Sequence, residues 1–425
     1  MDRMNLTLEY IKVQDIQWGD RTTVKKQVLY VNAAEAIEVL QDSMFSGISL
    51  DIARPGENIR IIPVKDVIEP RVKVKTGEFF PGFLGGFDGI GDGVTKVLKG
   101  CDVVTTGRIV GFQEGIIDMA GPGAEYCPYG KKNHVVLIAE PIEGIDPVEH
   151  ETAVRIAGIK LAHYLAKACM DIEGDEKEEF SLPPVDPDKK LPRVMYVNLL
   201  LAQGLLHDNY VYGMDEKKLQ TTLMHPNELL DGAVVSGNCV TASTKNTTYD
   251  YENNPVIMEL YKRHGKEVDF CGVISTPSNG YLAGKERGAL CTASIASLCR
   301  ADALIIAEEG GGNPEADIMM IAEAAEDRGI KCVILLHEVS GDYGESEPLA
   351  NTSPKADAVV TLGNVNEYVY LPKMERIIGH ADALVNLAGC GVEPLKPDGS
   401  LRVRLASIMD SVSNIGITTR TGRTY

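Results

Sequence analysis

The stretch from Ala233 to Ser243, Ala-Val-Val-Ser-Gly-Asn-Cys-Val-Thr-Ala-Ser, holds the residues of this chain that are best suited to unusual chemistry. An apolar run stops at Ser236-Gly237 and small residues follow, which predicts a sharp, accessible turn at Asn238 and Cys239. The Cys239 thiolate could attack the Asn238 carbonyl in an N-to-S acyl shift, replacing the amide by a thioester. Elimination and hydrolysis would leave a pyruvoyl group at position 239 and cut the chain there.

The same dipeptide has a simpler interpretation, in which Asn238-Cys239 is an inert turn. The chain would then stay uncut and serve as a scaffold or binding subunit of a larger complex.

The residues around Asn238-Cys239, the following Tyr251-Glu-Asn-Asn-Pro and the overall length resemble the proprotein of glycine reductase component B, over essentially the whole chain. The resemblance implies cleavage before a cysteine that becomes the pyruvoyl cofactor. Here that cysteine is Cys239, with Asn238 on the other side of the cut. The ketone would condense with the substrate amine as a Schiff base, activating the neighbouring carbon for displacement.

The resemblance also implies the partners. A selenoprotein subunit of component B would supply the attacking selenol, and a small selenoprotein carrier would receive the carboxymethyl group. A further component would release acetyl phosphate, with electrons from thioredoxin, so that glycine is reductively deaminated. Sarcosine and betaine reductases have related subunits, but the quaternary nitrogen of betaine cannot form a Schiff base, which favours glycine or sarcosine. D-proline reductase, whose related proprotein is longer, is a further alternative.

Composition limits the class of protein. A chain of 425 residues suits two or three domains. Its formal charge of -19 opposes binding to nucleic acid or anionic membranes. No basic-then-apolar start and no membrane-length apolar run occur, so we expect a cytoplasmic protein.

The nine cysteines are scattered and form no Cys-x-x-Cys pair, which argues against a zinc site, an iron-sulfur cluster or a dithiol motif. No metal is expected, and all cysteines except Cys239 are interpreted as buried, reduced thiols.

We expect an α/β protein that begins with a β-rich domain over residues 1–145, of barrel or sandwich type. One helix is predicted at Ala33–Asp42. A glycine-rich loop, Phe79–Gly93, lacks the strand-then-helix context and the Lys-Ser/Thr of a phosphate loop, and we interpret it as an exposed, aromatic-studded loop. The predicted strands are Leu6–Val13, Lys26–Val31, Asn58–Pro63, Ile68–Val74, Asp102–Val110 and His134–Glu140.

Two segments connect the predicted domains. Asp146-Pro147-Val-Glu is a typical helix start, and the connecting helix over residues 146–171 is mostly apolar, with His163 as a satisfied core histidine. Residues 172–191 are acidic and proline-rich, which predicts a solvated linker.

Residues 192–425 alternate strands and helices, which predicts a mostly parallel sheet with flanking helices and with the cleavage site inside this domain. Ligands of such sheets bind at the carboxyl ends of the strands. Three candidate positions follow: Glu308–Asn313, whose triple glycine is either an anion-binding or a plain tight turn; His337-Glu338, with His337 a candidate proton shuttle; and Gly389–Gly391. The predicted strands are Val194–Leu201, Val268–Ser275, Ala303–Ala307, Cys332–Leu336, Ala358–Leu362 and Ala383–Leu387, and the helices are Pro255–Gly265, Ala289–Arg300 and Pro314–Gly329.

Overall fold

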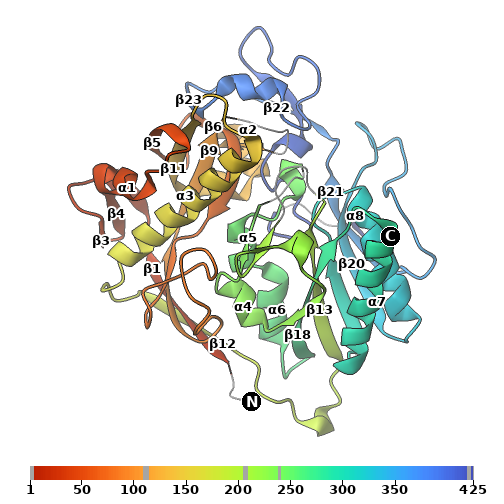
Figure 1. Ribbon diagram of the computed structural model, residues 1–425. Coiled ribbons are helices and arrows are strands. Elements are labelled where there is room, and N and C mark those ends of the chain that lie inside the picture. Colours follow the sequence, from red (N-terminus) through yellow and green to blue (C-terminus); the bar gives the residue numbers. More distant parts are fainter. Residues whose placement is uncertain (1–3, 109–113, 204–208, 238–240, 419–422, 425) are drawn as a thin grey trace.

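The computed structural model describes residues 4–108, 114–203, 209–237, 241–418 and 423–424. Helices and sheets are mixed along the chain, as the sequence predicts (Figure 1). The helices are α1 (Ala33–Leu40), α2 (Gly121–Tyr126), α3 (Pro147–Ala168), α4 (Pro226–Leu230), α5 (Thr248–Glu252), α6 (Pro255–Arg263), α7 (Leu282–Leu298) and α8 (Asn313–Glu326).

Two sheets are built mainly from the first part of the chain, and strands form at all six predicted places. The four-stranded sheet has the order β12 (Glu176–Ser181), β1 (Asn5–Lys12), β8 (Gly93–Lys99), β7 (Arg71–Lys73). The six-stranded sheet has the order β10 (Gly115–Asp118), β6 (Ile59–Ile68), β9 (Cys101–Gly107), β11 (Asn133–Pro141), β5 (Phe45–Ala53), with β23 (Arg376–Gly379) also paired to β6. Of the strands in these two sheets, β5, β8, β10, β12 and β23 were not predicted.

A seven-stranded sheet forms the centre of the second part. Its order is β16 (Thr222–Met224), β18 (Asp269–Ser278), β13 (Arg193–Leu201), β19 (Ala303–Ala307), β20 (Lys331–Glu338), β21 (Val359–Asn364), β25 (Arg423–Thr424). The five inner strands are mutually parallel, and β16 and β25 are antiparallel edges.

Alternate residues of β13 belong to different hydrophobic cores. Met195 and Val197 pack with side chains of α7 and α8. Val194 and Tyr196 pack with side chains of α6 and of β1. Both faces of the sheet are therefore covered, which explains why its strands are nearly continuous apolar runs.

Three short sheets complete the fold. They are β2 (Asp15–Trp18), β4 (Val28–Val31) and β3 (Thr23–Lys25); β15 (Met214–Asp215), β14 (Tyr210–Val211) and β17 (Val234–Val235); and β22 (Tyr368–Leu371) with β24 (Leu401–Arg404).

The predicted connecting helix is confirmed as α3. The Asp146 side chain accepts hydrogen bonds from the Val148 and Glu149 N–H groups, and Pro147 begins the helix. His163 is only half-buried, and its Nδ1 has no hydrogen-bond partner among the described residues, so it is not the satisfied core histidine expected.

The predicted solvated linker, residues 172–191, is wrong in its middle part. Residues 176–181 form β12, which pairs antiparallel with β1, and the Lys12 amine lies 2.7 Å from the Glu176 carboxylate. The charges belong to an edge strand rather than to a free tether. The division of the chain at residues 145, 171 and 191 stays a prediction.

Two further expectations are corrected. The predicted strand Ala383–Leu387 is largely a 3-10 helix, Ala381–Val385, which begins where the Ala383 N–H bonds to the His380 carbonyl. In the glycine-rich loop, Phe79 and Phe80 are buried and only Phe87 is well exposed.

The glycine-rich loop packs against the residues that follow β14. A Cβ on Gly82, whose φ is +82°, would lie 2.1 Å from the Tyr212 carbonyl oxygen, so only glycine permits this close approach. The loop therefore has a packing role next to β14.

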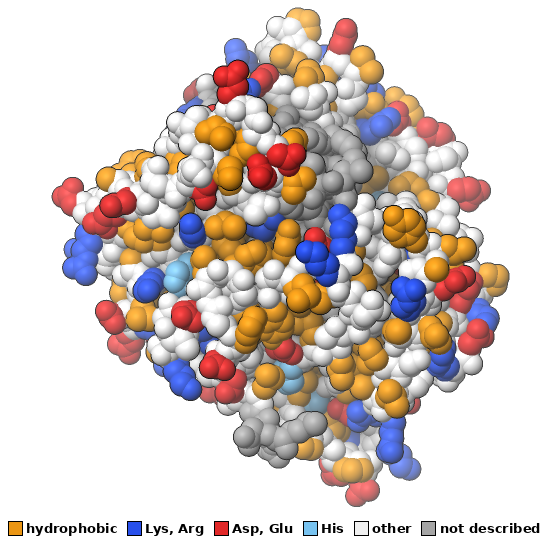
Figure 2. Space-filling model, in the orientation of Figure 1, with side chains coloured by type: hydrophobic (Ala, Val, Ile, Leu, Met, Phe, Trp, Pro, Cys, Tyr) orange, Lys and Arg blue, Asp and Glu red, His pale blue; other side chains and the backbone are white. Residues whose placement is uncertain are grey.

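Figure 2 shows acidic and basic side chains interspersed over one face of the molecule. Within the described part of the chain, none of the helices combines the length and apolar character needed to span a bilayer.

Candidate functional site

The residues that lead to the predicted cut are held by hydrogen bonds between their backbone and neighbouring side chains. Asn238, Cys239 and Val240 lie outside the described residues. Just before them, the Ser236 N–H donates to Thr248 Oγ1 at 3.1 Å, and the Gly237 N–H donates to Asn209 Oδ1 at 3.3 Å. Both N–H groups of this short segment are thus engaged by side chains.

Arg155 of α3 holds the two carbonyl groups of the same segment. Its Nε donates to the Ser236 oxygen at 3.2 Å and its Nη2 to the Gly237 oxygen at 3.1 Å. Its guanidinium lies 4.7 Å from the centre of the Tyr210 ring. A buried cation therefore contacts the carbonyl one residue before Asn238.

The residues after the predicted cut are also enclosed. Ala242 and Ser243 have no exposed surface, and their carbonyl groups accept from the Asp410 N–H at 2.9 Å and the Val412 N–H at 3.0 Å. An accessible turn was predicted here, but Ser236 and Gly237 before it are buried, and Thr241, the first described residue after it, is half-buried.

A buried amine and carboxylate lie beneath these flanks. Asp66 accepts from the Thr248 N–H at 2.9 Å and from its hydroxyl at 2.6 Å. Burial lowers the pKa of the Lys245 amine, partly offset by the charge of Asp66, and this amine donates to the Lys65 carbonyl. A buried lysine with a lowered pKa is a candidate base.

Glu309 is linked to the segment through Asn209. Its carboxylate accepts from the Leu201 N–H and the Tyr251 hydroxyl, each at 3.0 Å, and from the Asn209 amide. Burial raises the pKa of Glu309 to about 7, although these hydrogen bonds oppose the rise. Glu309 therefore fixes the amide that holds Gly237.

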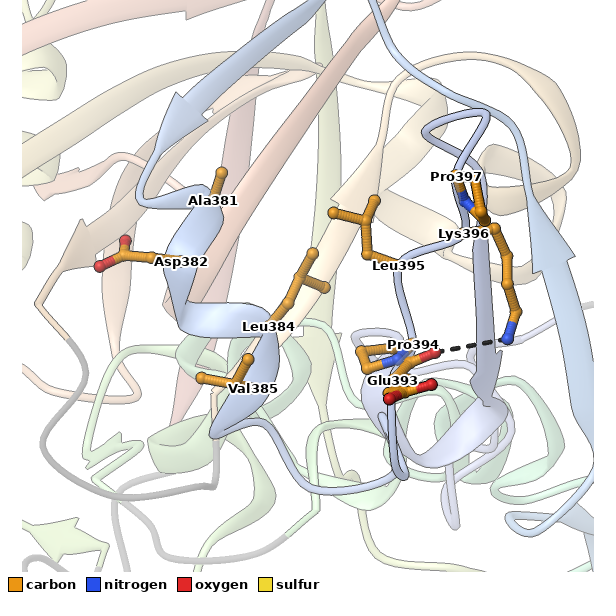
Figure 3. Close-up of a pocket in the computed structure, with 9 residues that line it drawn as sticks. All are labelled: Ala381, Asp382, Leu384, Val385, Glu393, Pro394, Leu395, Lys396 and Pro397. Atoms are coloured by element: carbon orange, nitrogen blue, oxygen red, sulfur yellow. Dashed lines mark hydrogen bonds between the residues drawn. The ribbon is translucent and has the colours of Figure 1, made fainter.

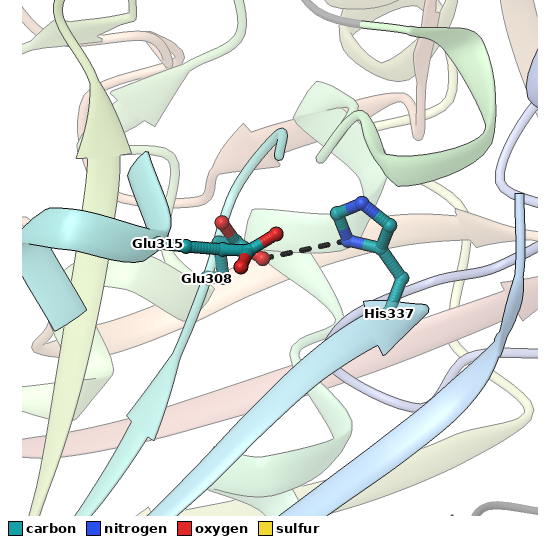
Figure 4. Close-up of side chains that lie close together, drawn as sticks. All are labelled: Glu308, Glu315 and His337. Atoms are coloured by element: carbon teal, nitrogen blue, oxygen red, sulfur yellow. Dashed lines mark ion pairs between the residues drawn. The ribbon is translucent and has the colours of Figure 1, made fainter. Parts of the chain in front are cut away.

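Glu308 and His337, both predicted as candidates at strand ends, are brought together (Figure 4). His337 Nδ1 lies 3.4 Å from Glu308 Oε2. Burial raises the pKa of Glu308 to about 7, and the neighbouring imidazole opposes this rise. Burial disfavours a charged His337, but Glu308, Glu315 and Asn414 together outweigh burial and raise the pKa of the imidazole. Glu315 of α8 joins the pair and was not predicted.

The third candidate segment, Gly389–Gly391, lies elsewhere. Cys390 packs in the hydrophobic core of the six-stranded sheet, and burial raises the pKa of its thiol to about 11. The eight described cysteines are all free; five are buried and three are half-buried.

A surface pocket in the C-terminal part is unrelated to these groups (Figure 3). It is lined by Ala381, Asp382, Leu384, Val385, Glu393, Pro394, Leu395, Lys396 and Pro397. Its walls carry no cysteine or histidine, and the Lys396 amine contacts the Glu393 carbonyl at 3.4 Å.

Arg155, Asn209 and Lys245 were missed by sequence reasoning. Arg155 lies within a mostly apolar helix, Asn209 follows a segment of no clear pattern, and Lys245 stands in a run of small polar residues. Arg155 is one of several charged residues of its helix and so gave no distinct signal, and only Lys245 was marked, as the single charge among small polar residues.

Residues 4–423 match the sequence model of a protein family, the glycine/sarcosine/betaine reductase component B subunits. The chain belongs to this family. It is 49% identical to the glycine reductase complex component B subunits alpha and beta of Acetoanaerobium sticklandii, over 99% of this chain and 100% of that protein. It is 43% identical to the sarcosine reductase complex component B subunit alpha of Peptoclostridium acidaminophilum, over 99% and 100%.

A more distant relative is the D-proline reductase proprotein of Acetoanaerobium sticklandii, which is 24% identical over 77% of this chain and 54% of that protein. No solved structure matches the chain. The family is therefore one of reductase-complex subunits.

Proposed function

We propose that this chain is a proprotein subunit of a glycine reductase-type complex that cuts itself between Asn238 and Cys239. The observation that carries the proposal is the family match over residues 4–423, which spans this dipeptide. The alternative substrates are sarcosine and betaine, because family members act in all three reductases by name. Glycine or sarcosine is favoured, since betaine cannot form a Schiff base.

The proposed cut begins when the Cys239 thiolate adds to the Asn238 carbonyl and the peptide nitrogen leaves, so that a thioester replaces the amide. Elimination breaks the Cβ–S bond, and sulfur departs with the Asn238 acyl group. Water then releases ammonia from the remaining dehydroalanine. A ketone at position 239 would supply an electrophile for the substrate amine, which ordinary side chains lack.

The described residues suit this chemistry by fixing the approach to the bond. Arg155, Asn209 and Thr248 hold the backbone of residues 236–237, while the loop at Asp410–Val412 holds residues 242–243. A backbone restrained on both sides favours intramolecular attack, because little conformational freedom is lost on reaching the reactive geometry. Lys245 is proposed as a base, because it is buried three residues after Ala242 and burial lowers the pKa of its amine.

His337 is proposed as a proton shuttle for the amine reaction, supported by its contact with Glu308. The proposed partners are a selenol-bearing subunit of component B, a small selenoprotein carrier, an acetyl-phosphate-forming component and the thioredoxin system. We propose that these proteins meet in the cytoplasm.

The test is an intact mass of the purified protein under denaturing conditions. We expect two fragments, 1–238 and 239–425, with the second fragment blocked to Edman sequencing and reactive with hydrazines. A single uncut chain would support the scaffold alternative. A free amino-terminal cysteine on the second fragment would refute the acyl-shift route and favour cyclisation of the Asn238 side chain.

A further inference from the structure

Three buried side chains meet where two strands and a helix converge (Figure 4). Glu308 follows β19, His337 lies near the end of β20, and Glu315 lies in the first turn of α8. Each offers a ligand atom, and these atoms all lie within 4.8 Å of one another. Glu308 and Glu315 have no exposed surface, and His337 is 2% exposed.

The three groups differ in how they are satisfied. Glu315 Oε2 accepts from the Ala350 N–H at 2.7 Å and the Asn351 N–H at 2.9 Å, which fixes this carboxylate in place. Among the described residues, only His337 contacts the Glu308 carboxylate closely, and neither Glu308 oxygen accepts a well-formed hydrogen bond. The Asn414 side chain is also fully buried, and its contact with His337 contributes to raising the pKa of the imidazole.

A buried carboxylate without donors is costly unless a cation or a proton compensates it. Two carboxylates and one imidazole form a donor set that binds Zn²⁺, Mn²⁺ or Fe²⁺, which take oxygen and nitrogen ligands. Ligand atoms about 2.1 Å from such an ion lie roughly 3–4 Å apart, so a small contraction of this cluster would accommodate it.

We propose that Glu308, Glu315 and His337 bind one divalent transition-metal cation. Asn414 contacts His337 and is available as a further oxygen ligand, because its amide already donates to the Gly310 carbonyl at 3.2 Å and its oxygen accepts no hydrogen bond of good geometry among the described residues. Remaining positions on the cation would be taken by water.

The triple glycine gives the cluster its space. A Cβ on Gly311 would lie 2.3 Å from His337 Cε1 and 2.4 Å from Nε2. Any larger residue at this position would displace the imidazole from Glu308. The glycine run therefore serves side-chain clearance, a role different from the anion-binding turn considered from the sequence.

This proposal goes beyond the proposed function and does not depend on cleavage at Asn238-Cys239. It differs from the expectation of no metal, which rested on cysteine spacing alone. It also competes with the proton-shuttle role of His337, since a bound cation takes up an imidazole nitrogen.

The experiment uses the full chain, freed of any affinity tag and of metal by chelation. Zn²⁺, Mn²⁺, Fe²⁺ (without oxygen) and Co²⁺ are each titrated and followed by calorimetry, with visible absorption as a second readout for Co²⁺. We expect one equivalent of at least one of these cations to bind. Glu308→Gln and His337→Ala should each weaken binding by about 100-fold.

Glu338→Gln is the matched control, because Glu338 is a buried carboxylate next to His337 in sequence that accepts from the Thr361 hydroxyl at 2.7 Å instead. It should bind the cation as the unmodified chain does. No binding of any of the four cations by the unmodified chain, or unchanged binding by Glu308→Gln and His337→Ala, would overturn the proposal. Because the first readout needs no variant, misfolding of a variant does not leave the question open.

Discussion

The Asn209 side chain connects Glu309 to Gly237. Its oxygen accepts the Gly237 N–H at 3.3 Å, and its amide donates to the Glu309 carboxylate. A carboxylate just beyond the end of β19 thus orients an amide that holds the backbone of Gly237, the residue before Asn238. The sequence predicted ligand binding at the carboxyl ends of the strands, but Glu309, at such a position, holds the backbone of Gly237 through Asn209.

Asn209→Ala should slow self-cleavage, because the Gly237 N–H loses its acceptor and the preceding backbone loses its restraint. One hydrogen bond contributes about 1 kcal/mol, so we expect a reduction of roughly five- to tenfold. The measurement is the fraction of cut chain over time on denaturing gels after synthesis. Asn227→Ala is the control, because this buried amide binds the Gly91 and Phe180 carbonyls instead. Equal rates in the unmodified chain and Asn209→Ala would exclude the positioning role.

Arg155→Lys should also slow cleavage. A lysine keeps the charge but cannot reach the Ser236 and Gly237 carbonyl groups with two separate N–H donors, as the guanidinium does. We expect a loss of about tenfold in the cleavage rate, measured by mass spectrometry of timed samples. Arg193→Lys is the control. Arg193 also forms an ion pair, with Asp269, but it lies at the first residue of β13 and has no contact with Ser236 or Gly237 among its hydrogen bonds. A similar slowing in both variants would indicate general destabilisation.

Fragments 1–238 and 239–425 should stay together without denaturant. β13, from before the cut, lies between β18 and β19, from after it, and is hydrogen-bonded to both. β23 likewise pairs with β6, so both the six-stranded and the seven-stranded sheet contain strands of the two fragments (Figure 1). We expect one peak in gel filtration in mild buffer and two in urea. Two peaks in mild buffer would contradict a shared core.

If Cys239 is the nucleophile of self-cleavage, its replacement by alanine and by serine should have different effects. Cys239→Ala should abolish cleavage and activity, because no nucleophile remains. Cys239→Ser should retain slow cleavage, since a hydroxyl can form the analogous ester but is a weaker nucleophile than a thiolate at neutral pH. Gel analysis and activity assays with the partner proteins measure both. Full activity in Cys239→Ala would rule out a ketone derived from this residue.

Much of the fold could be predicted because local signals agree with the tertiary structure. The Asp146 cap and Pro147 define α3, and Ala303–Ala307 is β19 with identical bounds. β12 was missed because charges at an edge strand look like those of a solvated linker, and only pairing with β1 distinguishes the two. Such pairing between distant segments leaves no local pattern.

The candidate site was predicted only in part. Glu308 and His337 were found because both lie at the carboxyl ends of strands of a parallel sheet, and these ends lie at one edge. Glu315 was missed because an acidic residue in the first turn of a helix is ordinarily explained by the helix dipole. Arg155 comes from a helix that precedes the sheet in sequence, so no spacing rule connects it with Ser236 and Gly237.

The stability of the fold should depend on pH through His134. This buried imidazole bonds to the Tyr129 carbonyl at 2.8 Å, and burial lowers its pKa from 6.5 to about 3. Because the folded-state pKa is below the unfolded one, its contribution is complete above about pH 6.5 and is lost as the pH falls toward 3.

His134→Gln isolates this contribution, since an amide can donate to the Tyr129 carbonyl but does not titrate. Below pH 6.5, the free energy of unfolding of the unmodified chain should fall relative to that of His134→Gln by about 1.4 kcal/mol per pH unit. Urea unfolding followed by circular dichroism at pH 7.5, 6 and 5 measures the difference between the two proteins. A difference that stays constant across these three pH values would show that His134 is not held neutral by the fold.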